Sequence, residues 1–135
     1  ILMGFPGETE EETEETLSLV RTLPLTYAHV FPYSQRPGTR AAVMPGQLPR
    51  KLRQEHAARV RSLVAEKHAA FLEHQLQISS MQVAFDGQDG RHGNNQWYAD
   101  CRLEGGDSSL CHGHELVEAS PVRIENGILI VHKKG

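Results

Sequence analysis

Cysteine is scarce in this sequence and long apolar runs are missing, which together exclude several classes of protein. Among 135 residues there are two cysteines, Cys101 and Cys111, too few for the disulfide framework of a small secreted domain. No apolar run reaches the roughly 18 residues of a membrane-spanning helix, and the first residues lack the pattern of a signal peptide. We therefore expect a cytoplasmic protein with reduced thiols and no membrane partner.

Glycine and proline are unevenly distributed, and charge follows the same division. Residues 47–86 contain no glycine, and six of the seven prolines fall at or before Pro49. The net charge is −3 over residues 1–49, +3 over residues 50–76 and −3 over residues 77–135. With 39% hydrophobic and 23% charged residues, the composition is that of a globular protein of one domain or two small ones.

The first segment has the pattern of a strand, a helix and a second strand. Residues 1–5 are apolar and resemble the end of a buried strand, so we expect the chain to be a fragment of a longer protein. Thr9 and Glu12 fit a capping box at the start of a helix. Pro24 ends that helix, and residues 26–31 are rich in strand-forming side chains. This order predicts a βαβ unit whose two parallel strands need further strands to complete a sheet.

The rest of the chain changes from helical to alternating spacing of its apolar residues. One long helix is predicted from about Leu52 to Leu76, with Arg53 among the residues left to solvent. Alternation after residue 77 predicts about five short strands, and hence a small closed barrel such as the OB fold. Those strands are expected near residues 81–85, 97–103, 117–119, 122–124 and 128–130. Trp97, Ala99, Cys101 and Leu103 are expected on the apolar face of one of them.

Two loops follow the predicted parallel strands. The first is Gly4-Phe5-Pro6-Gly7-Glu8-Thr9, and the second runs over residues 33–41. In α/β folds ligands bind at the carboxyl ends of strands, where glycines let the backbone approach a ligand closely. Arg36 can pair with a carboxylate or a phosphate. The alternative interpretation is that glycine and proline merely shape turns here.

Taken in order, these features resemble a known family. GFPGET, an acidic helix, FPYSxRPGTxA and a long basic helix are together similar to the radical S-adenosylmethionine methylthiotransferases. The stretch from His29 to Ser34 resembles most the branch that acts on threonylcarbamoyladenosine in tRNA. Residues 36–39 (Arg-Pro-Gly-Thr) differ from the branch that modifies a ribosomal protein, which stays as an alternative.

The resemblance implies a mixed α+β fold in two parts. Residues 1–76 would be the C-terminal part of a radical-enzyme α/β barrel, and residues 77–135 a small all-β, OB-like TRAM domain that grips RNA. The partners implied are a tRNA anticodon stem-loop and the rest of the parent polypeptide. The parent would bind S-adenosylmethionine and 4Fe-4S clusters. By the same resemblance, the cofactor-binding residues are Gly4, Phe5, Pro6, Gly7, Glu8, Thr9, Ser34 and Arg36.

The cysteines limit what this chain can do by itself. The family's radical cluster needs a Cys-x3-Cys-x2-Cys motif, which this sequence lacks, so we expect the chain alone to bind no cluster and to be inactive. We therefore assign no catalytic residue. Cys111, His112 and His114, with Cys101 and His92 upstream, suggest zinc, but their spacing is unlike that of common zinc sites. An ordinary turn is the better interpretation, and no metal site is assigned.

RNA-binding residues are predicted in the last segment. Tyr98 and Arg102 are expected on the strand face opposite Trp97, as a stacking group and a phosphate-pairing group, and Arg91 lies in the loop before it. The basic helix is a second place where RNA could bind, although a solvated face is the simpler explanation of its charge. The acidic balance of residues 77–135 is unusual for a nucleic-acid module. A non-catalytic OB-like module that binds RNA or protein is therefore the alternative function.

Overall fold

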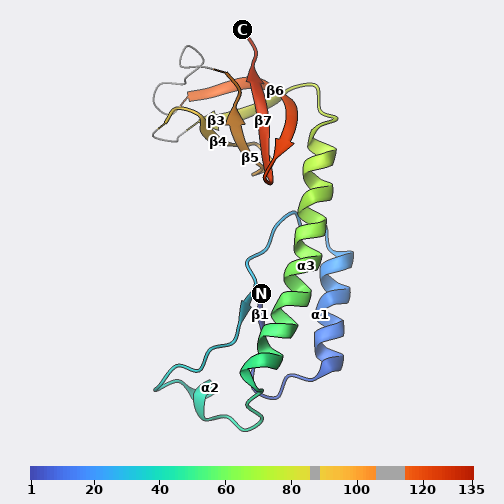
Figure 1. The fold of residues 1–135 in the computed structure, drawn as a ribbon, viewed down its shortest axis with the longest axis vertical. Helices are drawn as coiled ribbons and strands as arrows, with labels where there is room; N and C mark the ends of the chain where they lie inside the picture. Colours follow the sequence, from blue (N-terminus) through green and yellow to red (C-terminus); the bar gives the residue numbers. More distant parts are fainter. Residues whose placement is uncertain (86–88, 106–114) are drawn as a thin grey trace. The chain divides into compact units, whose positions relative to one another are not determined.

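The computed structural model describes residues 1–85, 89–105 and 115–135 (Figure 1). The chain divides into two compact units, residues 1–68 and residues 69–135, and each is described by itself. None of the helices in the described part of the chain is both long and apolar enough to cross a membrane.

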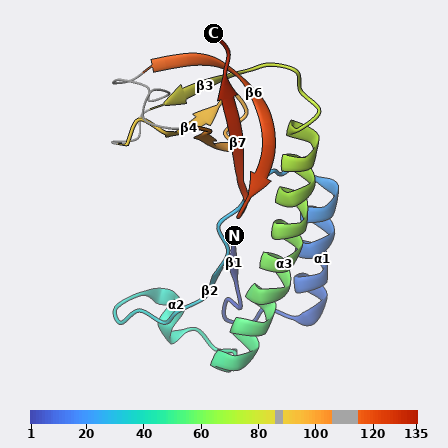
Figure 2. The ribbon, with the colours of Figure 1, turned by 45° about the horizontal axis from the view of Figure 1, so that its top comes forward.

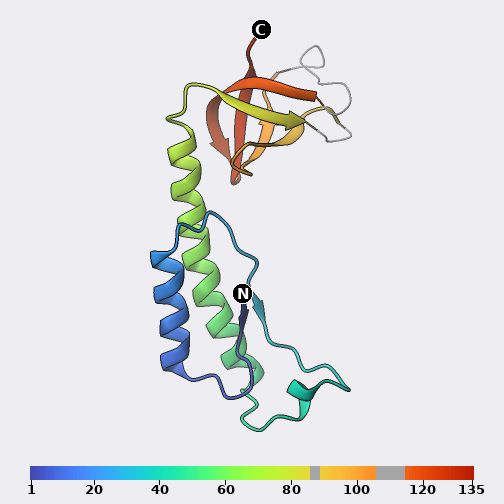
Figure 3. The ribbon, with the colours of Figure 1, turned by 180° about the vertical axis from the view of Figure 1, so that it is seen from behind.

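The first unit is built on a pair of short parallel strands, as the βαβ pattern predicts. β1 (Leu2–Met3) pairs with β2 (Phe31–Pro32), and Met3 lies opposite Pro32. Between them runs α1 (Glu10–Thr22), and β2 is followed by the single turn of α2 (Arg40–Val43). The long helix α3 (Arg50–Gln75) lies beside α1 (Figure 3). Apolar side chains from these elements form one core: Met3, Leu17, Val20, Val30, Ala57, Val60 and Val64.

The predicted strand over residues 26–31 is wrong except at its last residue. Residues 27–30 form no strand, and two of their backbone carbonyl oxygens accept from groups that lie outside the strands. The carbonyl oxygen of His29 accepts from the amino group of Ile1, and that of Val30 accepts from Arg61. The aromatic residues that favoured a strand pack against one another instead, with the Tyr27 and His29 rings edge to face and their centroids 5.0 Å apart.

The long helix is confirmed, but one of its side chains lies elsewhere than predicted. α3 begins two residues before the predicted start and ends one residue before the predicted end. Arg53 was expected in solvent, yet it is half-buried and donates from Nη1 to the carbonyl oxygen of Tyr33 over 2.9 Å. The sequence pattern shows which helix face is apolar but not which loops cover its edge.

The second unit is a closed barrel of five strands in the order β3-β4-β5-β7-β6 (Figure 2). β5 and β7 are parallel, and the other neighbouring pairs are antiparallel. The architecture is compatible with the predicted small OB-like barrel. The strands are β3 (Met81–Phe85), β4 (His92–Asn95), β5 (Asp100–Leu103), β6 (Glu115–Glu125) and β7 (Ile128–Lys133).

Three details of the barrel differ from the sequence prediction. β4 lies where a flexible loop was expected. Trp97 is 41% exposed in the turn before β5, whereas Ala99, Cys101 and Leu103 are buried as predicted. The predicted strands 117–119 and 122–124 are one strand, β6, with a register shift between Pro121 and Arg123. One extra residue at that bulge reverses the side that faces the core, so two short alternating runs appear in the sequence.

Candidate functional site

The two predicted loops meet at the carboxyl ends of β1 and β2. The amide of Tyr33 donates to the carbonyl oxygen of Met3 over 2.7 Å, which continues the strand pairing into the loops. The Phe5 and Tyr33 rings then pack edge to face, with their centroids 5.5 Å apart. Residues from two distant motifs are thus brought into one place, as their positions after parallel strands predict.

Gly4 begins the first loop in a conformation that other residues avoid. Its φ is +75°, and a Cβ at this position would lie 2.5 Å from Cγ of Arg53. Both the backbone angle and the close approach of α3 require glycine here. The motif glycine therefore lets the first loop lie directly against α3.

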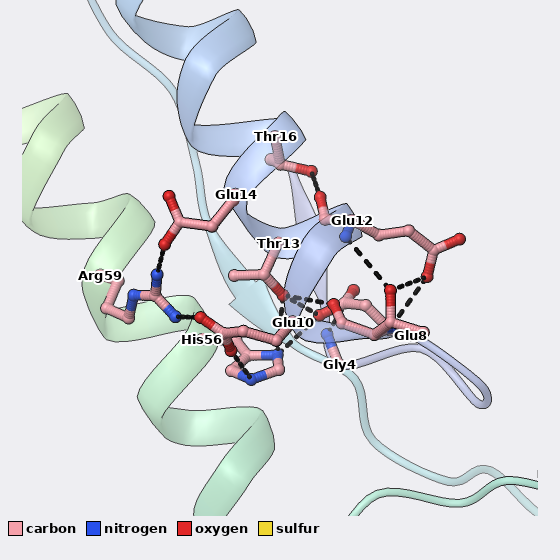
Figure 4. A network of polar contacts seen from close by, with 10 residues as sticks. Gly4, Glu8, Glu10, Glu12, Thr13, Glu14, Thr16, His56 and Arg59 are labelled. Carbon is pink, nitrogen blue, oxygen red and sulfur yellow. Dashed lines mark hydrogen bonds and ion pairs between the residues drawn. The ribbon is translucent and has the colours of Figure 1, made fainter.

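The Glu8 carboxylate ties the first loop to both helices (Figure 4). One oxygen, Oε2, accepts from the Gly4 amide over 2.8 Å, and the other, Oε1, accepts from the Thr13 hydroxyl over 3.1 Å. Nδ1 of His56 lies 2.8 Å from Oε1, and the Thr13 and His56 side chains are buried. A half-buried carboxylate with its acceptor capacity used in this way is a loop anchor, because these partners all belong to the chain itself.

The acidic first turns of α1 face basic groups of α3 rather than solvent alone. Arg59 forms ion pairs with Glu10 and Glu14, and its hydrogen bond to Glu10 raises the pKa of the guanidinium. Nε2 of His56 lies 3.4 Å from Oε2 of Glu10. The acidic residues of α1 and the basic residues of α3 therefore form ion pairs that join these two neighbouring helices.

The second loop borders a polar hollow of about 500 Å³. Its lining comes from the end of β2, the loop and the first turns of α3: Pro32, Tyr33, Ser34, Gln35, Arg50, Arg53 and Gln54. Ser34 and Arg36 are exposed, but only Ser34 lines the hollow. The Arg36 carbonyl oxygen accepts from the Thr39 hydroxyl over 2.8 Å, and Thr39 also caps α2.

A smaller hollow of about 290 Å³ borders the first loop and is lined by Phe5, Pro6, Gly7, Glu8, Glu12 and Thr16. Four of the predicted cofactor-binding residues line it, whereas Gly4 is buried against α3 and Thr9 caps α1. Arg53 was missed as a site residue. Its spacing of three from His56 places both on one face of α3, where each holds one of the two loops.

The described part of the chain has few side chains placed to react as a thiolate or to bind a metal. Cys101 is buried, and burial raises the pKa of its thiol to about 12. Within the described ranges, no three His, Cys, Asp or Glu side chains lie together as a metal site would need. Cys111, His112 and His114, which carried the zinc alternative, lie outside the described residues.

The three predicted RNA-binding residues lie on one hairpin, β4 with β5, but not on one strand face. Arg91 and Arg102 line a hollow of about 170 Å³ at the open end of the hairpin. Tyr98 lies in the turn at the other end, 88% exposed and at a φ of +62°. The buried Asn95 side chain holds this turn, accepting from the amides of Trp97 and Ala99 over 3.0 Å each. The expectation that Tyr98 and Arg102 share a strand face is therefore wrong.

Carboxylates compete for the basic groups at the open end of the hairpin. Arg123 also lines this hollow, and it pairs with Glu104 and Glu125, which raise the pKa of its guanidinium. The local charge is thus partly neutralised, in keeping with the acidic balance of the segment.

Comparison with known proteins gives relatives of one kind, although no family model matches. The tRNA-2-methylthio-N(6)-dimethylallyladenosine synthase of Nocardia farcinica is 36% identical over 123 residues, which are 91% of this chain and 24% of that protein. The enzyme of the same name from Streptomyces viridosporus is 52% identical over 66 residues, 49% of this chain and 13% of the relative. The threonylcarbamoyladenosine tRNA methylthiotransferase of Treponema pallidum is 40% identical over 74 residues, 55% of this chain and 15% of the relative.

These relatives are much longer than the chain and carry two different substrate names. The chain spans between 13% and 24% of the length of the three relatives described. Both the dimethylallyladenosine and the threonylcarbamoyladenosine names occur among them, so the comparisons do not select the branch that the sequence favoured. The resemblance itself is confirmed: the chain is related, over as much as 91% of its residues, to the tRNA methylthiotransferases.

Proposed function

We propose that this chain is the C-terminal part of a radical S-adenosylmethionine tRNA methylthiotransferase. Residues 1–76 complete the catalytic barrel of the parent, and residues 77–135 form its TRAM domain. The proposal rests on one observation: the two motif loops meet at the ends of β1 and β2. Arg53 and His56 of α3 each form a hydrogen bond to one of these loops. The relatedness to tRNA methylthiotransferases supports the same reaction class.

The two loops are the part of the cofactor pocket that this chain contributes. Phe5, Pro6 and Gly7 present backbone groups and one aromatic ring beside a hollow, and Ser34 presents a hydroxyl beside another. Gly4, Glu8 and Thr9 shape and anchor the first loop, and the exposed Arg36 is left to pair with an anionic group. S-adenosylmethionine supplies the methyl group and the radical when it is bound beside an iron–sulfur cluster. Cysteines elsewhere in the parent hold the clusters.

The barrel contributes RNA binding through the β4–β5 hairpin. Tyr98 offers an exposed ring for base stacking, and Arg91 and Arg102 offer charge for phosphates. Tyr98 lies in the turn before β5 and Arg102 lies within β5, four positions further along the chain. That spacing suits unpaired nucleotides of a loop better than a single base. The substrate we favour is the tRNA anticodon stem-loop, modified at threonylcarbamoyladenosine, with a ribosomal protein as the alternative.

A second function fits the barrel alone. The second unit has a closed set of strands and a core of its own, so it can serve as a non-catalytic module that binds RNA or protein. The two functions differ in what the first unit does, because only the enzyme needs the loops at the ends of β1 and β2.

The test is an NMR titration of the isotope-labelled chain with a tRNA anticodon stem-loop at two salt concentrations. We expect salt-sensitive shifts at Tyr98 and Arg102. Arg102→Gln should bind the stem-loop more weakly than the control Lys134→Gln, which also removes one positive charge but at a residue that does not line the hollow. An absence of shifts in residues 77–135 at low salt would remove RNA binding from the barrel and favour a protein partner.

A further inference from the structure

The basic side chains of α3 differ in whether they have hydrogen-bond or ion-pair partners. Arg59 pairs with Glu10 and Glu14, and Arg61 donates to the carbonyl oxygen of Val30. Lys67 donates to the carbonyl oxygens of Arg21 and Leu23 at the end of α1. The helix charge that the sequence suggested for RNA is therefore largely used inside the first unit.

Arg50 and Arg53 differ from the others because both line the 500 Å³ hollow. Within the described residues, the side chain of Arg50 is exposed and has no hydrogen-bond or ion-pair partner. Arg53 is fixed by its bond to the Tyr33 carbonyl oxygen and by its position 5.7 Å from the centroid of the Tyr33 ring. One guanidinium is thus held in place and a second is available.

The lining of the hollow carries no negative charge. Apart from the two arginines it consists of neutral residues, and Ser34 and Gln35 supply polar side chains. The hollow also borders the start of α3, whose first turn contains no acidic residue. α1 is the opposite case, with Glu10, Glu11 and Glu12 in its first turn. The positive end of the α3 dipole therefore stays without a compensating carboxylate, beside two arginines.

We propose that this hollow is a phosphate-binding site, with Arg50 as the main contact and Arg53 as the preset one. A hollow lined by two guanidinium groups and by neutral polar side chains suits a phosphate with several free oxygens better than a planar carboxylate. The source of the phosphate rests on the proposed function: in a tRNA-modifying enzyme it is the RNA backbone, bound at the two arginines, whereas Ser34 on the same hollow belongs to the proposed cofactor pocket. The chemistry of the hollow does not depend on that assignment.

The experiment titrates the isotope-labelled chain with inorganic phosphate and, separately, with acetate, both at constant ionic strength. Amide shifts of Ser34, Gln35 and Arg50 report binding. The test variant is Arg50→Gln, and the control is Lys51→Gln, which removes the same charge from the next residue. The Lys51 side chain is 89% exposed, pairs with Glu55 and does not line the hollow.

We expect saturable phosphate shifts at the three amides, with the dissociation constant raised about tenfold by Arg50→Gln and less than about twofold by Lys51→Gln. Equal weakening by both variants, or no saturable shift, would overturn the site. Tighter binding of acetate than of phosphate would overturn the assignment to phosphate and point to a carboxylate ligand. Phosphate binding that survives while the anticodon stem-loop fails to bind would separate this site from the proposed function.

Discussion

Gly4 is required by two independent features of its surroundings, and a substitution series can separate them. Gly4→Ala adds a side chain at a φ of +75° and places its Cβ 2.5 Å from Cγ of Arg53. We expect a loss of about 2–5 kcal/mol in the free energy of unfolding, from left-handed strain plus overpacking. Urea unfolding followed by the helical circular dichroism signal measures it.

Gly7→Ala is the matched control for that prediction. Gly7 has a φ of +87°, but a Cβ there meets no atom within 4 Å. Only the backbone strain of about 1–2 kcal/mol is expected. Equal losses in the two variants would show that the approach of Arg53 does not constrain the loop.

Cys101 predicts a pH dependence of the stability of the barrel. Burial raises the pKa of its thiol from 9.0 to about 12, so the unfolded chain loses this proton at lower pH than the folded chain. The contribution of Cys101 is therefore fully present below about pH 9 and is lost as the pH rises toward 12. Unfolding free energies measured across this range should decline more steeply in the native chain than in Cys101→Ala.

The same thiol should be chemically protected in the folded state. At about pH 8, far below the raised pKa of about 12, the Cys101 side chain stays a thiol in nearly all folded molecules. Alkylation mapped to the peptide that contains Cys101 should therefore be slow until denaturant is added. Fast labelling of the folded chain would contradict the burial of this side chain.

At the scale of single residues, the sequence was informative where a local rule applies. Glycine in the first motif was expected to allow a close approach of the backbone, and Gly4 makes one, although to Arg53 of α3 and not to a ligand. The position of Arg53 could not be predicted, because it depends on where the second loop crosses the helix. Trp97 was assigned to the core from alternation alone, but the side chain of Asn95 turns the chain before the strand begins.

At the scale of elements, the cap of α1 gives a direct test. The Thr9 hydroxyl accepts from the Glu12 amide over 3.2 Å, and the Glu12 carboxylate accepts from the Thr9 amide over 2.8 Å. Thr9→Ala should lower the unfolding free energy by about 1 kcal/mol, and Thr9→Ser should retain most of it. Thermal unfolding of the two variants distinguishes them, and identical curves would contradict a role for the cap.

The same elements show why helices were easier to predict than strands. α1 and α3 carry their own signals, a capping box in one and a long stretch without glycine or proline in the other. β4 contains glycine and asparagine and exists because Gly93 and Asn95 pair with Phe85 and Val83. Such pairing is a property of two segments together, so neither segment reveals it alone.

At the scale of the whole chain, the two units differ in how their strands are completed. β1 and β2 form a sheet of two strands with two paired positions, whereas β3 to β7 close into a barrel. We expect amides of residues 1–49 to exchange with deuterium faster than amides in the described part of residues 78–132. Hydrogen exchange followed by NMR measures both, and equal protection would show that the first unit is completed without further strands.

The two-stranded sheet also affects how the isolated chain should behave at high concentration. Leu2 and Phe31 are 51% and 59% exposed, and within the described residues each strand has one neighbour, so open edges and apolar surface occur together. Such edges accept strands from other molecules, whereas a closed barrel offers none. Light scattering should therefore rise with protein concentration, and a charged residue in place of Leu2 should suppress that self-association without changing the barrel.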